Sequence, residues 1–199
     1  MPVSKSDLVR GIAILGMNGA GKSTLAHALA KATGFRELDL EDFYFPEQRA
    51  SRVHALEHDT VIRTEHLGDL PFSQPRSKAE VEKALLKAMS DGHGFIVSGV
   101  TLNFSPELLS RIDLAVELST PLTTRIQRIQ SREERRFGDR VLPGGDMYAQ
   151  QEDFRKMVET RDQTSAARSL AQLSCPVIYL DGTRPTEENS AILLAYIFS

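Results

Sequence analysis

The sequence predicts an α/β domain in which helices cover both faces of a five-stranded parallel sheet. Short apolar runs that fit buried strands alternate along the chain with stretches whose apolar residues recur at helical spacing. Such alternation is typical of parallel strands joined by right-handed helical crossovers. The chain has 199 residues, of which 41% are hydrophobic. We therefore expect a single domain, residues 1–199, with a sizeable core.

The strands and helices follow in order from local signals. A glycine-bounded apolar run predicts the first strand, and the helix after it ends at Gly34. Ser77 and Glu80 form a capping box, and Pro106 and Pro121 each follow a capping hydroxyl residue. The expected strands are 11–15, 35–40, 95–99, 112–118 and 176–180. The expected helices are 22–33, 77–91, a short one from 106, 121–136, 147–173 and 186–198, with loops at 137–145 and 181–185.

Composition narrows the class of protein. The chain carries 24 lysines and arginines against 27 aspartates and glutamates, which is not the basic balance of a protein that coats nucleic acid. Cys175 is the one cysteine, so no intramolecular disulfide can form and a reducing, cytoplasmic compartment is expected. No apolar run approaches the roughly 18 residues that span a bilayer. Because residues 1–10 are polar, we also expect no signal peptide.

A glycine-rich loop joins the first strand to the first helix. Residues 16–23, Gly-Met-Asn-Gly-Ala-Gly-Lys-Ser, fit the pattern G-x-x-x-x-G-K-[ST] of a P-loop. Such a loop turns its backbone N–H groups into one concavity at a helix N-terminus, where anions are favoured. We expect Lys22 to reach the β- and γ-phosphates of ATP and Ser23 to hold Mg²⁺. The predicted nucleotide-binding residues here are Gly16, Asn18, Gly19, Ala20, Gly21, Lys22, Ser23 and Thr24.

The P-loop indicates that the expected fold is a three-layer sandwich of the P-loop NTPase type. Other motifs exclude some of the functions that such a fold can have. The chain lacks the N-K-x-D motif that reads guanine and the long strand ending in Asp-Glu of motor ATPases. Its glycines do not fit the G-x-G-x-x-G pattern of NAD and FAD sites. Once these classes are excluded, small phosphoryl-transfer enzymes are the favoured class of protein. The other class left open is a nucleotide-binding regulatory or RNA-associated protein that hydrolyses ATP slowly.

An acidic cluster follows the second predicted strand. Asp39, Glu41 and Asp42 leave this strand at its carboxyl end, where ligands of open α/β sheets bind. A kinase usually needs a carboxylate there to take the proton of the acceptor hydroxyl. Residues 42–46, Asp-Phe-Tyr-Phe-Pro, resemble the D-[DS]-F-[YL]-x-P segment of the uridine kinase and pantothenate kinase group. The resemblance implies that Asp42 is the catalytic base; the alternative is that these acids are solvated residues of a turn.

The third predicted strand bears on which acidic residue would help to hold Mg²⁺. Residues 95–100 resemble the uridine kinase segment in which an apolar strand ends in Glu-Gly, and the glutamate helps to hold Mg²⁺. Here Ser98 stands in the place of that glutamate. The departure favours Asp39 or Glu41 as the acid that supports the metal, and our expected metal site is Ser23 with Asp39.

Six arginines lie between residues 125 and 140. Arg125, Arg128, Arg132 and Arg136 are spaced to share one helix face, which leads into a glycine-containing loop. Such a helix and loop, here 125–146, are what a lid over a triphosphate requires. The spacing resembles the lid helix of the same kinase group and of nucleoside monophosphate kinases. That implies nucleotide binding by Arg128, and closure of Arg132 and Arg136 over the transferring group. A solvated helix paired with its own glutamates, or a basic patch for RNA, are the alternatives.

Two further segments are candidates for contacts with the adenine base and with the acceptor. The loop 181–185 stands where small P-loop kinases often pack against adenine, which implies contacts from Gly182 and Thr183; a turn that caps the next helix is the alternative. Residues 43–76 have little periodicity, and in related kinases this segment carries the acceptor-binding lobe. Cations that can meet an acidic group of the acceptor, or simply lie on the surface, are Arg52, His54, Arg63 and His66.

The sequence as a whole predicts an ATP- and Mg²⁺-dependent kinase. Its expected partner is a small-molecule acceptor, namely a nucleoside, a nucleotide or another hydroxyl metabolite, rather than nucleic acid or a membrane. A nucleoside monophosphate kinase, whose acceptor is a phosphate, is the second reading. Lys22, Asp42, Arg132 and Arg136 are the predicted catalytic residues.

Overall fold

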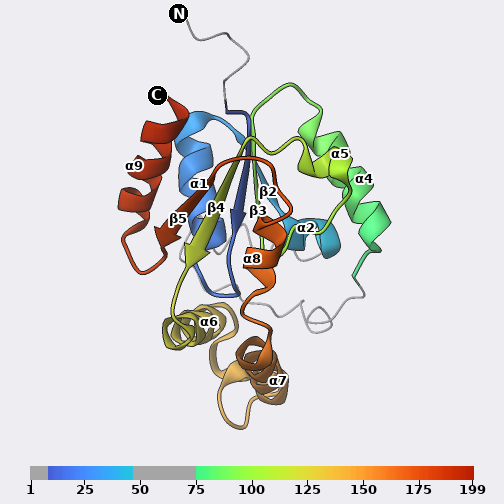
Figure 1. The fold of residues 1–199 in the computed structure, drawn as a ribbon. Helices are drawn as coiled ribbons and strands as arrows, with labels where there is room; N and C mark the ends of the chain where they lie inside the picture. The colour runs from blue at the N-terminus through green and yellow to red at the C-terminus, as the bar shows by residue number, and fades with distance from the viewer. Residues whose placement is uncertain (1–8, 47–74) are drawn as a thin grey trace, which may run out of the picture.

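The computed structural model describes residues 9–46 and 75–199, and its centre is a five-stranded parallel sheet (Figure 1). The strands are β1 (Gly11–Leu15), β2 (Arg36–Asp39), β3 (Phe95–Gly99), β4 (Leu114–Ser119) and β5 (Val177–Asp181). Their order across the sheet is β2-β3-β1-β4-β5, and all neighbouring pairs are parallel. The predicted fold class is confirmed, including all five strands.

Two hydrophobic clusters, one on each face of the sheet, make the fold three-layered. On one face, α1 (Lys22–Thr33) and α9 (Thr186–Ile197) cover side chains such as Ile12 and Ile14. On the other, α4 (Lys78–Met89), α5 (Pro106–Leu109) and α8 (Ser165–Leu170) cover Ala13 and Leu15. All five residues of β1 are buried, which is why this strand is a continuous apolar run rather than an alternating one.

The capping signals at Gly34, Ser77 and Ser105 form as expected. The signal at Thr120 does not, because the Thr120 hydroxyl donates to Ala20 O, and Pro121 is itself the N-cap of the next helix, without a side-chain cap. Gly34 adopts φ 74° and its N–H donates to the Ala30 carbonyl, so α1 ends there. The Ser77–Glu80 capping box is present in both directions at the start of α4. These contacts satisfy backbone groups that a helix end would otherwise leave unpaired.

Four expected elements differ from the structure. The predicted strand 35–40 ends at Asp39, because the Asp39 carboxylate accepts from Glu41 N–H and caps a further helix, α2 (Leu40–Tyr44). The strand predicted from 112 begins at Leu114, since the Asp113 carboxylate is held outside the sheet by the N–H groups of Arg10 and Gly11. The loop 137–145 contains a 3-10 helix, η2 (Gly138–Val141).

The fourth difference is that the polar stretch 147–173 forms two helices, α7 (Tyr148–Thr160) and α8. Asp162 accepts from the N–H and the hydroxyl of Thr164, and this local turn competes with continuation of the helix. Most of the segment 43–76, with Arg52, His54, Arg63 and His66, lies outside the described residues.

A helical arm lies beyond the carboxyl ends of the strands (Figure 1). It consists of α6 (Leu122–Phe137), η2 and α7, residues 122–160. The chain enters the arm from β4 and returns through a corner at residues 161–164 to α8, which packs on the sheet. Among the described residues, no helix combines the length and the apolar character needed to cross a membrane.

Candidate active site

The P-loop lies between β1 and α1, at the edge of the sheet that faces the helical arm (Figure 1). Gly19 and Gly21 have φ angles of 80° and 100°, which L-residues with a side chain rarely adopt. A Cβ at Gly19 would lie 2.6 Å from the Arg125 carbonyl oxygen. The loop therefore needs these glycines both for its curvature and for its close contact with α6.

Lys22 is the cation at the centre of this loop. Its Nζ donates to the Met17 carbonyl oxygen at 3.0 Å, and burial lowers its pKa to about 8, although Glu41 and Asp39 act in the opposite direction. No salt bridge to Lys22 is formed within the described part of the chain. A desolvated ammonium held only by a loop carbonyl is suited to receive an anion.

Ser23 and Asp39 meet directly beside Lys22. The Ser23 hydroxyl donates to Asp39 Oδ2 at 2.7 Å, and the pKa of Asp39 is raised, first by burial and then by the nearby Glu41. Mg²⁺ with a nucleotide is typically held by one or two oxygen side chains together with the phosphates. The two oxygens on adjacent elements fit that role, and the described residues contain no cluster of three His, Cys, Asp or Glu side chains that would hold a metal without phosphates.

Ser98 adds a third oxygen to this corner. It stands opposite Asp39 in the register of β2 with β3, so both side chains lie on the face of the sheet that α1 covers. Its side chain is buried, and its hydroxyl has no hydrogen-bond partner among the described residues. Such a group in a protein interior is costly and is often a site for a water or an ion.

Asp42 lies on α2, which continues from the carboxyl end of β2. The side chain is half-buried, and its charge contributes to the raised pKa of Asp39. Glu41 and Asp39 in turn act on Lys22. The structure therefore brings the predicted acidic cluster next to the P-loop; the assignment of Asp42 as the base stays a prediction.

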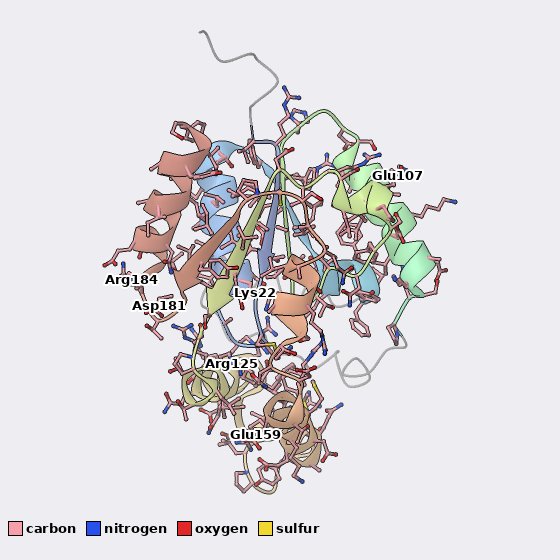
Figure 2. The ribbon with its side chains drawn as sticks, viewed as in Figure 1. Lys22, Glu107, Arg125, Glu159, Asp181 and Arg184 are labelled. Atoms are coloured by element: carbon pink, nitrogen blue, oxygen red, sulfur yellow. The ribbon has the colours of Figure 1, made fainter. Side chains whose placement is uncertain are left out.

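Arg125 takes a position different from the one that a lid arginine would need. It is only 2% exposed, and its Nε, Nη1 and Nη2 donate to Thr120 O, Asn18 O and Gln163 Oε1 at 3.1, 3.2 and 2.5 Å. Its donors are thus used to hold backbone and side-chain oxygens within the protein. Figure 2 shows Arg125 close below Lys22, at the junction of the sheet and the arm.

Arg128 connects the P-loop with the loop after β5. Its Nη1 donates to Ala20 O at 3.2 Å and its Nη2 to Gly182 O at 2.9 Å. The Thr183 N–H and hydroxyl donate to Asp181 Oδ1, which lowers the pKa of this exposed carboxyl. The loop 181–185 is thus a turn closed by Asp181. It does not cap α9 (Thr186–Ile197) as the sequence alternative expects, because the N-cap of this helix is Pro185 and no side chain caps it. Adenine contacts from Gly182 and Thr183 stay a prediction.

Arg132 and Arg136 lie further along α6 and share one buried acid. Glu133 Oε1 accepts from Arg132 Nε at 2.7 Å, and it forms ion pairs with Arg132 Nη2 at 2.7 Å and Arg136 Nη1 at 3.8 Å. The positive charge of Arg132 also lowers the pKa of Lys22, so this arginine lies within electrostatic reach of the P-loop. Glu133 is therefore more than a solvated partner, because it holds both predicted arginines on one face of the arm.

Sequence reasoning missed Arg161 and Gln163, which follow α7. Arg161 Nη1 donates to Asn18 Oδ1 at 3.1 Å, and the charge of Arg161, like that of Arg132, lowers the pKa of Lys22. Spacing gives no sign of this contact, because the corner is far from the P-loop in sequence. The one available signal is the turn-forming pair Asp162 and Thr164, which ends the helical stretch just after Arg161.

A cavity of about 210 Å³ lies inside the helical arm rather than at the P-loop. Its lining combines apolar side chains with Glu133 and Arg155, and none of the P-loop residues takes part in it. The cavity lies among α6, η2 and α7, which also contact one another.

The sheet order, the P-loop and the surrounding side chains define a P-loop protein with a kinase-like fold. Residues 12–141 match the model of the AAA domain family, and the chain belongs to that family. A protein of Bacillus subtilis (strain 168), YqaC, which is itself uncharacterized, is 28% identical, with 96% of this chain and 98% of that protein covered.

Several solved structures share this fold at low sequence identity. A gluconokinase from Sinorhizobium meliloti 1021 is 15% identical with a TM-score of 0.54, covering 96% of this chain and 92% of its own. Deoxyadenosine kinase from M. mycoides with bound dATP is 13% identical with a TM-score of 0.51, covering 95% and 100%. A shikimate kinase from Bacteroides thetaiotaomicron is 16% identical with a TM-score of 0.51, covering 95% and 98%. At these identities, the likeness concerns the fold.

Proposed function

We propose that this protein is an ATP-dependent kinase that transfers the γ-phosphoryl group to a small acceptor. The acceptor class is a nucleoside, a nucleotide or another hydroxyl metabolite. The observation that carries the proposal is the 2.7 Å hydrogen bond from Ser23, the residue after Lys22 in the P-loop, to Asp39. The charges of Asp39 and Glu41 also act on the pKa of Lys22. A phosphate cradle and a carboxylate cluster at one sheet edge are the two parts that phosphoryl transfer needs.

The P-loop side of the site binds the triphosphate. Backbone N–H groups at the start of α1 and the Lys22 ammonium face the phosphate oxygens, and the exposed Thr24 lies one residue beyond the metal-binding hydroxyl. Ser23 and Asp39 would hold Mg²⁺, which neutralises charge on the β- and γ-phosphates when it is bound. Arg128, fixed between Ala20 and Gly182, would lie along the nucleotide, with Gly182 and Thr183 next to the base.

Asp42 is the group proposed to take the acceptor proton. As the acceptor oxygen bonds to the γ-phosphorus, the bond from this phosphorus to the bridging oxygen breaks, ADP leaves, and the hydroxyl proton passes to the Asp42 carboxylate. The resemblance of residues 42–46 to the uridine kinase and pantothenate kinase group supports this role, as does the position of α2 at the carboxyl end of β2.

Arginines of the arm are proposed to close over the transferring group. Arg132 and Arg136 are held by Glu133, and Arg161 is held by Asn18. Arg132 and Arg161 both lower the pKa of Lys22, and this effect on a P-loop residue supports the proposal. An arginine that meets transition-state charge in this way contributes about 10³–10⁵-fold to the rate of some phosphoryl transfers.

The test is ADP release with a panel of nucleosides, nucleotides and vitamin-like alcohols as acceptors. With the best acceptor, Asp42→Asn should lower turnover by roughly 10²–10⁴-fold, because it removes the base while leaving α2 in place. Glu107→Gln is the matched control, since Glu107 lies on α5, far from Lys22 (Figure 2), and turnover should not change. A loss below tenfold in Asp42→Asn would show that the base is another residue.

A nucleoside monophosphate kinase is the second candidate. The observation in its favour is that Arg132 and Arg161 both lie within electrostatic reach of Lys22, which supplies cations for a second phosphate-bearing molecule. A phosphate acceptor is already ionised and needs arginines more than a base. Retained turnover in Asp42→Asn, with loss in Arg52→Ala or Arg63→Ala, would favour this function. ATP hydrolysis that no acceptor stimulates would favour a regulatory ATPase instead.

A further inference from the structure

Four residues form a closed ring of hydrogen bonds, through side chains and two main-chain carbonyl oxygens, between the P-loop and the helical arm. Arg161 Nη1 donates to Asn18 Oδ1 at 3.1 Å, and Arg125 Nη1 donates to the Asn18 carbonyl oxygen at 3.2 Å. Arg125 Nη2 donates to Gln163 Oε1 at 2.5 Å, and Gln163 Nε2 donates to the Arg161 carbonyl oxygen at 2.6 Å. Asn18 is the P-loop member of the ring and takes part twice.

The ring fastens both ends of the arm to one residue. Arg125 lies in the first turn of α6, where the chain enters the arm, and Arg161 is the residue that ends α7, where it leaves. A shift of the P-loop backbone at Asn18 would therefore change hydrogen bonds at both ends of the arm. Arg125 is 2% exposed and donates three hydrogen bonds, so its side of the ring is enclosed by the protein. The Arg161 side is less enclosed, since this residue is half-buried.

Arg161 has hydrogen-bonding capacity left over. Among the described residues, its guanidinium makes one hydrogen bond, to Asn18, although it carries five N–H groups. The hydrogen bond to Asn18 brings this guanidinium to the P-loop, and its charge lowers the pKa of Lys22. A guanidinium that is held by one neutral oxygen of the P-loop and keeps further donors is suited to phosphate recognition.

We infer that Asn18 is a positioning residue that aims Arg161 at the phosphates of the nucleotide in the P-loop. The inference rests on the proposed ATP site and adds a role that no P-loop pattern assigns, because position 18 is a variable position of the G-x-x-x-x-G-K-[ST] motif. An asparagine oxygen suits this role. It orients the guanidinium without negative charge, whereas an aspartate would bind Arg161 more tightly but repel the triphosphate.

The test is a double-mutant cycle on ATP binding, measured by titration calorimetry without any acceptor. Arg161→Ala should weaken ATP binding by about 10- to 100-fold, the range expected for one charge-assisted hydrogen bond. Asn18→Ala should weaken it by about tenfold, because Arg161 then lacks its anchor. In the Arg161→Ala background, Asn18→Ala should change the dissociation constant less than twofold. A purely structural role of Asn18 would instead make the two losses multiply.

Arg168→Ala is the matched control. Its partner Asp162 lies next to Arg161 but outside the ring, so ATP binding should not change. Each variant is also checked by thermal unfolding. If Asn18→Ala does not fold, Arg161→Lys decides, since a lysine keeps the charge but loses the directed contact and should recover only part of the binding. Multiplying losses, or an Arg161→Ala protein with wild-type affinity, would overturn the inference. A wild-type protein that binds ATP but transfers to no acceptor would overturn only the kinase proposal.

Discussion

At the level of single residues, the pKa of Lys22 leads to a prediction of how ATP affinity depends on pH. Its pKa is about 8 because burial disfavours the ammonium form. Bound phosphates would favour this form and raise the pKa again. The free and the nucleotide-bound protein should therefore differ in proton occupancy just above pH 8.

The sign of the resulting pH dependence follows from linkage. Below about pH 8 Lys22 is already charged in the free protein, so ATP affinity should be nearly independent of its titration. Above about pH 8 a proton must be taken up on binding, and affinity should fall by up to about tenfold per pH unit. Calorimetry between pH 7 and 9.5 checks this, with Lys83→Met on α4 as a control that keeps the slope. A flat profile over this range would contradict the assignment.

Ser98 gives a prediction in which stability and metal affinity move in opposite directions. Its buried hydroxyl has no partner among the described residues, so Ser98→Ala should stabilise the protein without Mg²⁺ by about 1 kcal/mol. If the hydroxyl contacts a water of the Mg²⁺ site, the same change should raise the Mg²⁺ concentration needed for half-maximal turnover. Urea unfolding and Mg²⁺ titration measure the two effects, and Ser110→Ala, which is exposed, should alter neither. A less stable Ser98→Ala protein with unchanged Mg²⁺ dependence would contradict both parts.

At the level of elements, the strand–loop–helix unit from β1 to α1 could be predicted from sequence because its signals are local. The apolar run, the glycines and the helix formers each act over a few residues, and α1 has the expected bounds. α2 could not be predicted, because its capping residue Asp39 is also the last residue of a strand. Five residues give no helical period to detect.

The arginines of α6 show what the spacing of residues in a sequence does not predict. Four arginines at helical intervals correctly predict a helix, but spacing does not say which oxygens they meet. Arg125 meets the backbone of Asn18 and Thr120, while Arg132 meets Glu133. These partners depend on how the arm packs beyond the sheet, which is a tertiary feature.

The difference between the arginines leads to a stability prediction for α6. Arg125→Met should destabilise the protein by about 3 kcal/mol, because it leaves two carbonyl oxygens and Gln163 without their donors. Arg135→Met, at an exposed position of the same helix, should change stability by less than about 0.5 kcal/mol. Urea unfolding of the two variants measures this difference. Equal stabilities would mean that the buried contacts of Arg125 carry no net free energy.

At the level of the whole molecule, the net charge of −3 combines two separated groups of opposite sign. Acids at the end of β2 and the arginines Arg132 and Arg161 come from different elements, and both groups act on the pKa of Lys22. This arrangement explains why composition alone suggested no partner. Opposite charges converge only after the chain folds, at the edge where the strands end.

Because the ring at Asn18 fastens both ends of the arm, we expect nucleotide binding to restrain the arm as well as the P-loop. A non-hydrolysable ATP analogue should slow amide hydrogen exchange in the P-loop, in the α6 turn that holds Arg132 and at the 161–164 corner, since bound phosphates would restrain these segments together. α4 and α5 pack on the face of the sheet opposite α1 and lie away from the arm in Figure 1, so they serve as the internal control, with unchanged exchange. In Asn18→Ala the protection of the P-loop should persist while that of the corner is lost. Protection confined to residues 16–24 in the wild-type protein would show that the arm does not respond to the nucleotide.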